Sequence, residues 1–255
     1  MGSAESERRV GEQAGSLRPA FYALGRGGLR DYGTLLHPPY TAWHLSYVGI
    51  GAALAPSFSA RRLLATMVAF FLAVGIAAHA MDELHDRPLA TDISASTLAV
   101  LSGVSMTGAL VIGAWGAVTV SAWLWLFVAA GAFMAVAYSL ELFGGWFHGD
   151  WWFAVAWGAF PLVTAYFAQA GRVALVAMLA AGFATATSLA QRALSTHVRG
   201  IRRATRDVAG HLEHQDGSRT PITRDYMIAT DETALRFLVW ANVLLAVTLT
   251  TARLS

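Results

Sequence analysis

The sequence predicts an all-α polytopic membrane protein with about seven transmembrane helices. Of its 255 residues, 56% are hydrophobic and 13% are charged, whereas soluble domains carry about 25% charged residues. Three stretches lack Asp, Glu, Lys and Arg altogether: 93–140, 151–171 and 173–191. Stretches of this length can cross a bilayer, which takes about 20 apolar residues per helix.

The order of the spans follows from the apolar segments. Pro38 and Pro39 mark the start of the first span and Pro56 marks its end, because proline is tolerated at a helix start and disfavoured in a helix interior. The expected spans are Tyr40–Ala55, Leu63–Met81, Ser94–Ala114, Val118–Ser139, Trp151–Gln169, Val173–Leu194 and Ala234–Thr250. Residues 1–30 are predicted to form a disordered or interfacial tail. Residues 31–255 are predicted to form one transmembrane domain, with 204–230 as a cytoplasmic loop.

The arginines predict the orientation of the chain. All 18 basic residues are Arg, which excludes a Schiff-base lysine, and the absence of cysteine excludes disulfides and thiolate metal sites. Most arginines lie in the N-terminal tail and between the last two spans. Because cytoplasmic loops are enriched in basic residues, we expect a cell (inner) membrane protein with a cytoplasmic N-terminus and a polar cap on the cytoplasmic side.

The most polar stretch closes the second span. His79, Asp82, Glu83 and Asp86 recur at i, i+3, i+4 and i+7, which places them on one helix face. Such carboxylates suit a divalent cation, with Mg²⁺ favoured, and the neighbouring imidazoles would also suit Zn²⁺, Mn²⁺ or Fe. The alternative interpretation is a solvated helix end whose carboxylates pair with Arg87.

Two further groups of polar residues fall on the same predicted side. Tyr138, Glu141 and His148 flank the turn after the fourth span, where an aromatic interface loop is the alternative. Arg192 and Arg199 share a face at i and i+7 and suit a diphosphate, whereas a lipid-binding positive cluster is the alternative. The remaining candidates are Gln191 and His44 as substrate-binding residues and His148 and His197 as metal ligands.

Several motifs resemble the UbiA-type intramembrane prenyltransferases. The entry segment Leu36–His44 is similar to the one that precedes their first span, and Tyr138-Ser139-Leu140 resembles their Tyr-Ser segment. The segment from Asp82 to Thr91 resembles their first aspartate-rich motif with its Arg-Pro-Leu tail. The second aspartate motif has no counterpart after the sixth span.

The resemblance implies a helical bundle with a capped central cavity that binds a prenyl diphosphate through Mg²⁺. On this basis the predicted catalytic residues are Asp82, Asp86, Arg87, Tyr138 and Glu141. We expect a divergent enzyme that transfers or cleaves an isoprenoid or other lipid substrate in the bilayer, with no nucleic-acid partner. One alternative is a His/carboxylate enzyme that uses Zn²⁺ or a di-iron pair on a lipid, and another is a non-catalytic lipid-binding or assembly subunit.

Overall fold

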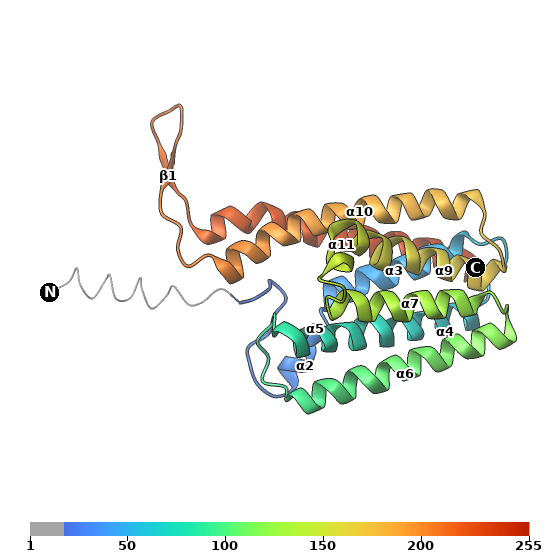
Figure 1. The fold of residues 1–255 in the computed structure, drawn as a ribbon. Coiled ribbons are helices and arrows are strands. Elements are labelled where there is room, and N and C mark those ends of the chain that lie inside the picture. The colour runs from blue at the N-terminus through green and yellow to red at the C-terminus, as the bar shows by residue number, and fades with distance from the viewer. Residues whose placement is uncertain (1–17, 255) are drawn as a thin grey trace.

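The computed structural model describes residues 18–254, and in these residues nearly all regular structure is helical. A short helix, α2 (Leu29–Leu35), precedes the bundle, and 3₁₀ helix η2 (Trp146–His148) follows α7. The long helices are α3 (Pro38–Leu54), α4–η1–α5 (Ala60–Phe70, Phe71–Ala78 and His79–Asp86), α6 (Ala95–Thr119), α7 (Leu124–Ser139), α8–η3–α9 (Asp150–Ala154, Val155–Ala159 and Phe160–Ala170), α10 (Leu175–Arg199) and α11 (Arg224–Leu254). They run side by side along one axis (Figure 1).

Four of these helices are long and apolar enough to cross a membrane: 60–86, 95–119, 150–170 and 224–254. The all-helical class and the membrane-spanning character predicted from the sequence are therefore confirmed at this level. The seven-span arrangement stays a prediction, and α7 is a shorter apolar helix of 16 residues.

Two predicted boundaries are wrong. Trp115-Gly116-Ala117 was expected in a loop, yet α6 continues to Thr119 and the turn to α7 lies at 120–123. Small residues such as Gly116 and Ala117 are tolerated within an apolar helix because neighbouring helices pack against them. The expected cytoplasmic loop 204–230 is shorter, because α11 already begins at Arg224.

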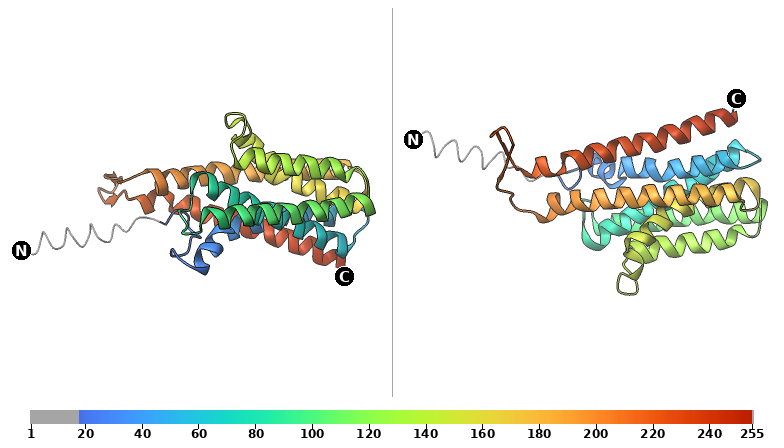
Figure 2. Two further views of the ribbon diagram at one scale, coloured as in Figure 1. Left: turned by 60° about the horizontal axis from the view of Figure 1, so that its bottom comes forward. Right: turned by 90° about the horizontal axis from the view of Figure 1, so that it is seen from above.

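The segment between α10 and α11 contains a hairpin of strands β1 (His211–Glu213) and β2 (Arg219–Pro221). The hairpin projects beyond the bundle at the end where α11 begins, and α11 runs from there to the other end (Figure 1). A second projection, the yellow-green loop after α7, leaves the bundle sideways (Figure 2). Residues 1–17 of the predicted tail lie outside the described residues.

Two of the long helices contain π-helical turns, η1 and η3. Single π-turns inside α-helices are frequent at functional sites because they change the direction of the backbone carbonyls. Close packing holds η3 against α10: a Cβ on Gly158 would lie 2.7 Å from the carbonyl oxygen of Ala184. Both π-turns lie next to the cavity described below.

Candidate functional site

A polar cavity of about 320 Å³ lies at the end of the bundle that carries the hairpin. Residues far apart in the sequence form it, from the segment before α2 to the π-helical turn that follows α10. Its wall residues with polar side chains are Tyr22, His37, Tyr40, His44, His79, Asp82, His85, Asp86, Tyr138, Ser139, Glu141, His148, Gln191, Arg192, Ser195, Arg199 and Arg203. The structure thus brings together most of the predicted site residues.

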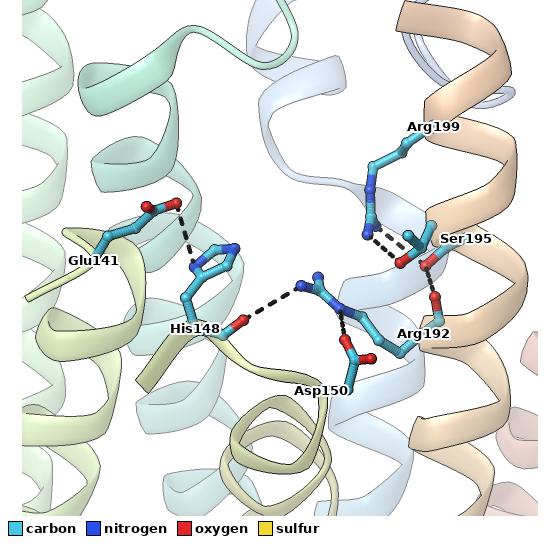
Figure 3. A network of polar contacts seen from close by, with 7 residues as sticks. Glu141, His148, Asp150, Arg192, Ser195 and Arg199 are labelled. Atoms are coloured by element: carbon cyan, nitrogen blue, oxygen red, sulfur yellow. Dashed lines mark hydrogen bonds and ion pairs between the residues drawn. The ribbon is translucent and has the colours of Figure 1, made fainter. Parts of the chain in front are cut away.

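One wall of the cavity is cationic. Arg192, Ser195 and Arg199 follow each other at i, i+3 and i+7 on α10, so the predicted shared face of the two arginines is confirmed. Arg192 donates to Asp150 Oδ1 at 3.0 Å and to the carbonyl of His148 at 3.4 Å (Figure 3). This network ties the loop after α7 to α10.

Arg199 has no acidic partner within the described residues. Its guanidinium donates to the hydroxyl oxygens of Ser195 at 3.1 Å and Thr196 at 2.9 Å. Arg203 likewise donates to the carbonyl of Pro19, at 3.1 Å, and in the described part of the chain pairs with no carboxylate. Two guanidinium charges at one cavity without a neutralising carboxylate favour an anionic guest.

The cavity is also lined by four imidazoles that share one hydrogen-bonding arrangement, and they are called the imidazole wall below. The Nδ1 atoms of His37, His44, His79 and His148 donate to the carbonyls of Leu35 (2.8 Å), Trp157 (2.8 Å), Gly75 (3.2 Å) and Tyr138 (3.1 Å). Because a carbonyl oxygen only accepts, each Nδ1 carries the ring hydrogen. Each Nε2 is then an acceptor, and none makes a hydrogen bond to another described residue.

Two of the acceptor carbonyls belong to the π-helical turns. Gly75 lies in η1 and Trp157 in η3, and these turns orient His79 and His44 toward the cavity. The rings of His37 and His79 face each other with centroids 4.0 Å apart, and His148 stacks on Tyr138 at 4.3 Å.

Buried polar atoms without partners mark the same cavity. Three buried side-chain atoms of the described residues lack a hydrogen bond, and two of them, Ser139 Oγ and Gln191 Oε1, belong to cavity residues. Native proteins keep few such groups because an unsatisfied buried polar atom costs about 1–3 kcal/mol. Their position indicates a site that a polar ligand completes.

An apolar chamber of about 130 Å³ adjoins the polar cavity. Phe70, Met106, Phe127, Ala132 and Phe160 are among the residues of its wall, which extends to Arg62 near the other end of the bundle. Val74 and Trp157 belong to the walls of both cavities. From residue 62 to residue 74 the helix rises about 18 Å, so the chamber suits an extended lipid chain.

Three predicted site residues lie elsewhere. Glu83 is fully buried and its carboxyl group accepts hydrogen bonds from the backbone N–H groups of Leu89 and Thr91 and from the Thr91 hydroxyl. It therefore holds the loop after α5 and is not a cavity ligand. Arg87 serves the same loop by donating to the carbonyls of Thr91 and Ile93.

His197 also lies outside the cavity wall. Its Nδ1 is 2.6 Å from Asp231 Oδ2 on α11, and the side chain is half-exposed. On α10 His197 lies two residues from Ser195 and Arg199 and therefore faces another direction, so its role as a metal ligand stays a prediction that this cavity does not use.

Sequence reasoning missed His37, Tyr22, Tyr40 and Arg203 as cavity residues. His37 was interpreted as a loop residue, yet its left-handed backbone (φ 45°) at the start of α3 places the ring on His79. Burial raises the pKa of the Tyr22 phenol well above its usual value, and Tyr40 adds to the effect. For His37, the available signal was the His-Pro-Pro sequence, because its two prolines fix where the helix starts and so place His37 just before it.

No group of three or more His, Asp or Glu side chains in residues 18–254 is arranged to hold a metal ion. Asp82 and Asp86, four residues apart on α5, both face the cavity. This pair fits Mg²⁺, which proteins usually bind through one or two carboxylates together with substrate phosphates.

Comparison of the chain with family models, curated proteins and solved structures gives no match. The site is therefore interpreted from its own geometry.

The site predicts a pH-dependent stability. Burial lowers the pKa of His37 to about 4, with a further contribution from Arg203 and Arg199. At a pH between the pKa of His37 in the unfolded chain, about 6.5, and its value in the folded protein, the unfolded chain binds more protons than the folded protein. The contribution of His37 to folding stability is therefore fully present above about pH 6.5 and is lost as the pH decreases. We expect a loss of about 2 kcal/mol by pH 4.5, measured as unfolding midpoints in detergent, and a weaker loss in His37→Phe. An unchanged pH profile in that variant would contradict the assignment.

Proposed function

We propose that this protein is a UbiA-like membrane enzyme that transfers or cleaves the chain of a prenyl diphosphate or a similar lipid phosphate. The observation that carries the proposal is the junction of a polar cavity and an apolar chamber at Val74 and Trp157. An amphiphile with a phosphate headgroup and one long chain fits both parts at once. A soluble phosphate compound would leave the chamber unused.

The headgroup would lie against the cationic wall. Arg199 and Arg203 supply charge that no described carboxylate neutralises, and Arg192, held by Asp150, extends the same wall. Charge-assisted bonds from these guanidinium groups would stabilise the negative charge that develops on a leaving diphosphate. Gln191, through its unpaired Oε1, and His44 line the adjoining wall.

Asp82 and Asp86 would hold a divalent cation next to the headgroup. Mg²⁺ bound there would supply Lewis-acid stabilisation of the phosphate oxygens. Tyr138 and Glu141, at the end of α7, face the same space and would position the reacting end of the chain. With the arginine-rich end in the cytoplasm, the headgroup would enter from the cytoplasmic side of the cell membrane.

Binding and turnover of geranylgeranyl diphosphate test the proposal. We expect purified protein to bind this lipid and to release diphosphate from it when Mg²⁺ is present, and chelation of Mg²⁺ to stop release. Arg199→Gln is expected to weaken binding about tenfold, because a charged hydrogen bond contributes about 1.5–3 kcal/mol. Asp82→Asn is expected to abolish release.

The matched control is Arg172→Gln. Arg172 is exposed in the turn before α10, at the opposite end of that helix from Arg199, and the same change there is expected to leave binding intact. Binding without release in any condition would support a non-catalytic lipid-binding protein. Failure of the wild-type protein to bind the lipid would refute the proposal.

A further inference from the structure

The polar cavity contains hydrogen-bond acceptors that a diphosphate, which offers almost no donors, cannot satisfy. Four imidazoles line this space, and because their Nδ1 atoms bond to backbone carbonyls, their Nε2 atoms are acceptors without a donor among the described residues. Gln191 Oε1 is buried there without a donor. The carboxyl group of Glu141, which is not assigned to the cation, adds further oxygens.

A diphosphate has only oxygen acceptors at neutral pH, apart from a residual proton. It matches the arginine wall, whose groups only donate. Against the imidazole wall it would displace water and leave nitrogen and oxygen lone pairs without donors, which is unfavourable in a buried site. The acceptor wall therefore requires donor groups from the bound molecule.

The donors that fit are neutral. Arg192, Arg199 and Arg203 already bring positive charge to the cavity, and the cation proposed at Asp82 and Asp86 would add more, so an ammonium group placed between them would be repelled. A hydroxyl group donates without adding charge. It also suits an imidazole whose tautomer is fixed, because the Nε2 lone pair then has a set direction.

Ring packing places the acceptors at two positions. His37 and His79 face each other at 4.0 Å, and His148 stacks on Tyr138 at 4.3 Å. The groups come from the start of α3, from α5 and from the loop after α7, and all of them line the cavity. His79 is 9% exposed, and its Nδ1 is held by the carbonyl of Gly75.

We infer that the headgroup or co-substrate bound in this cavity carries hydroxyl groups, which donate to His79 Nε2 and the neighbouring imidazoles while the phosphate lies on Arg199. This inference rests on the proposed function, since it assigns the phosphate to the arginine wall. It adds the chemical class of the rest of the headgroup: a hydroxylated phosphate ester.

Two single-chain lipids that differ by one hydroxyl group provide the test. Hexadecyl 2-hydroxyethyl phosphate and hexadecyl ethyl phosphate carry the same charge and the same chain. For the wild-type protein we expect the hydroxylated lipid to bind about tenfold more tightly, as measured by titration in detergent, because a site built for a hydroxyl rejects the analogue that lacks it. Hexadecyl phosphoethanolamine is expected to bind no better than the ethyl ester.

Variants of His79 test the hydroxyl inference, and a variant of Arg199 tests the phosphate assignment of the proposed function. His79→Phe is expected to reduce the preference for the hydroxylated lipid to less than threefold without weakening the ethyl ester. His79→Gln retains an acceptor oxygen and should retain the preference, and His211→Phe, on the exposed hairpin, is the matched control. Arg199→Gln should weaken both lipids alike.

Equal binding of the two lipids by the wild-type protein would overturn the hydroxyl inference and leave the proposed function standing. A preference for the phosphoethanolamine lipid would also overturn it, because the wall would then accept a cation. Binding of neither lipid, together with no binding of geranylgeranyl diphosphate, would overturn the proposed function.

Discussion

Replacing Glu83 with alanine is expected to lower the free energy of unfolding by about 3 kcal/mol. The side chain is fully buried, and it accepts from Leu89 N at 2.9 Å, Thr91 N at 2.8 Å and Thr91 Oγ1 at 2.9 Å. Without it, two backbone N–H groups of the loop after α5 lose their partner in a buried place. Unfolding of purified protein in mixed micelles measures the change.

Matched variants distinguish this role from a role in binding. Thr91→Val removes one of the three hydrogen bonds and is expected to cost about 1 kcal/mol. Asp86→Asn changes a carboxylate on the same helix that lines the cavity and is exposed to solvent, and it is expected to leave stability within about 0.5 kcal/mol. If Glu83→Ala retained full stability but lost lipid binding, Glu83 would be a cavity ligand after all and the structural role would be wrong.

The helical repeat of polar residues on α5 predicts three of the cavity residues correctly but not the position of Glu83. The spacing of His79, Asp82, Glu83 and Asp86 indicates one side of a helix, and three of the four do line the cavity. Consecutive residues are nevertheless turned by about 100°, so Asp82 and Glu83 cannot both be centred on one space. The sequence contains no signal that the following loop needs an acceptor, because that need arises from the loop conformation.

The loop itself explains part of the Arg-Pro-Leu motif. Arg87 and Ala90 have positive φ values of 52° and 50°, an uncommon backbone conformation for residues other than glycine. The carboxyl group of Glu83 and the guanidinium of Arg87 bond to the backbone of this loop from two sides. The resemblance assigns this segment to catalysis, whereas Glu83 and Arg87 hold the loop backbone, and the polar residues of the segment that line the cavity are Asp82, His85 and Asp86.

The cationic wall was predictable because it lies on one helix. Arg192 and Arg199 are seven residues apart on α10, so a periodic pattern places them together. Three of the four imidazoles, His44, His79 and His148, are candidates from the sequence, but their shared hydrogen-bonding arrangement and the part of His37 were not predictable, since they depend on the packing of α3 against η3 and on the turn at His37. Sequence spacing does not reveal contacts such as that of His44 with Trp157, which are 113 residues apart.

The π-helical turns were also not predictable from the sequence. Phe71–Ala78 and Val155–Ala159 read as uninterrupted apolar helix in the sequence. In the structure they supply the carbonyls of Gly75 and Trp157 to His79 and His44. They also provide Val74 and Trp157, where the two cavities meet. A hydrophobicity pattern finds the span but not the local change in backbone that builds the site.

Filling the apolar chamber is expected to separate chain binding from headgroup binding. Ala132 on α7 belongs to the chamber wall, so Ala132→Trp would occupy space that a long chain needs. If about four methylene groups lose their burial, at about 0.8 kcal/mol each, geranylgeranyl diphosphate should bind about a hundredfold more weakly. Dimethylallyl diphosphate, whose chain is too short to enter the chamber, should bind as weakly as it does to the wild-type protein.

The control for this change is Leu126→Trp. Leu126 lies on the same helix, is 61% exposed and is not part of the chamber wall, so a tryptophan there should leave both affinities unchanged. Equal weakening of the long and the short diphosphate by Ala132→Trp would mean that the variant damages the polar cavity as well. Undiminished binding of the long lipid would mean that its chain lies outside the chamber, along the surface of the bundle. The junction of the polar cavity and the apolar chamber would then no longer support the proposed function.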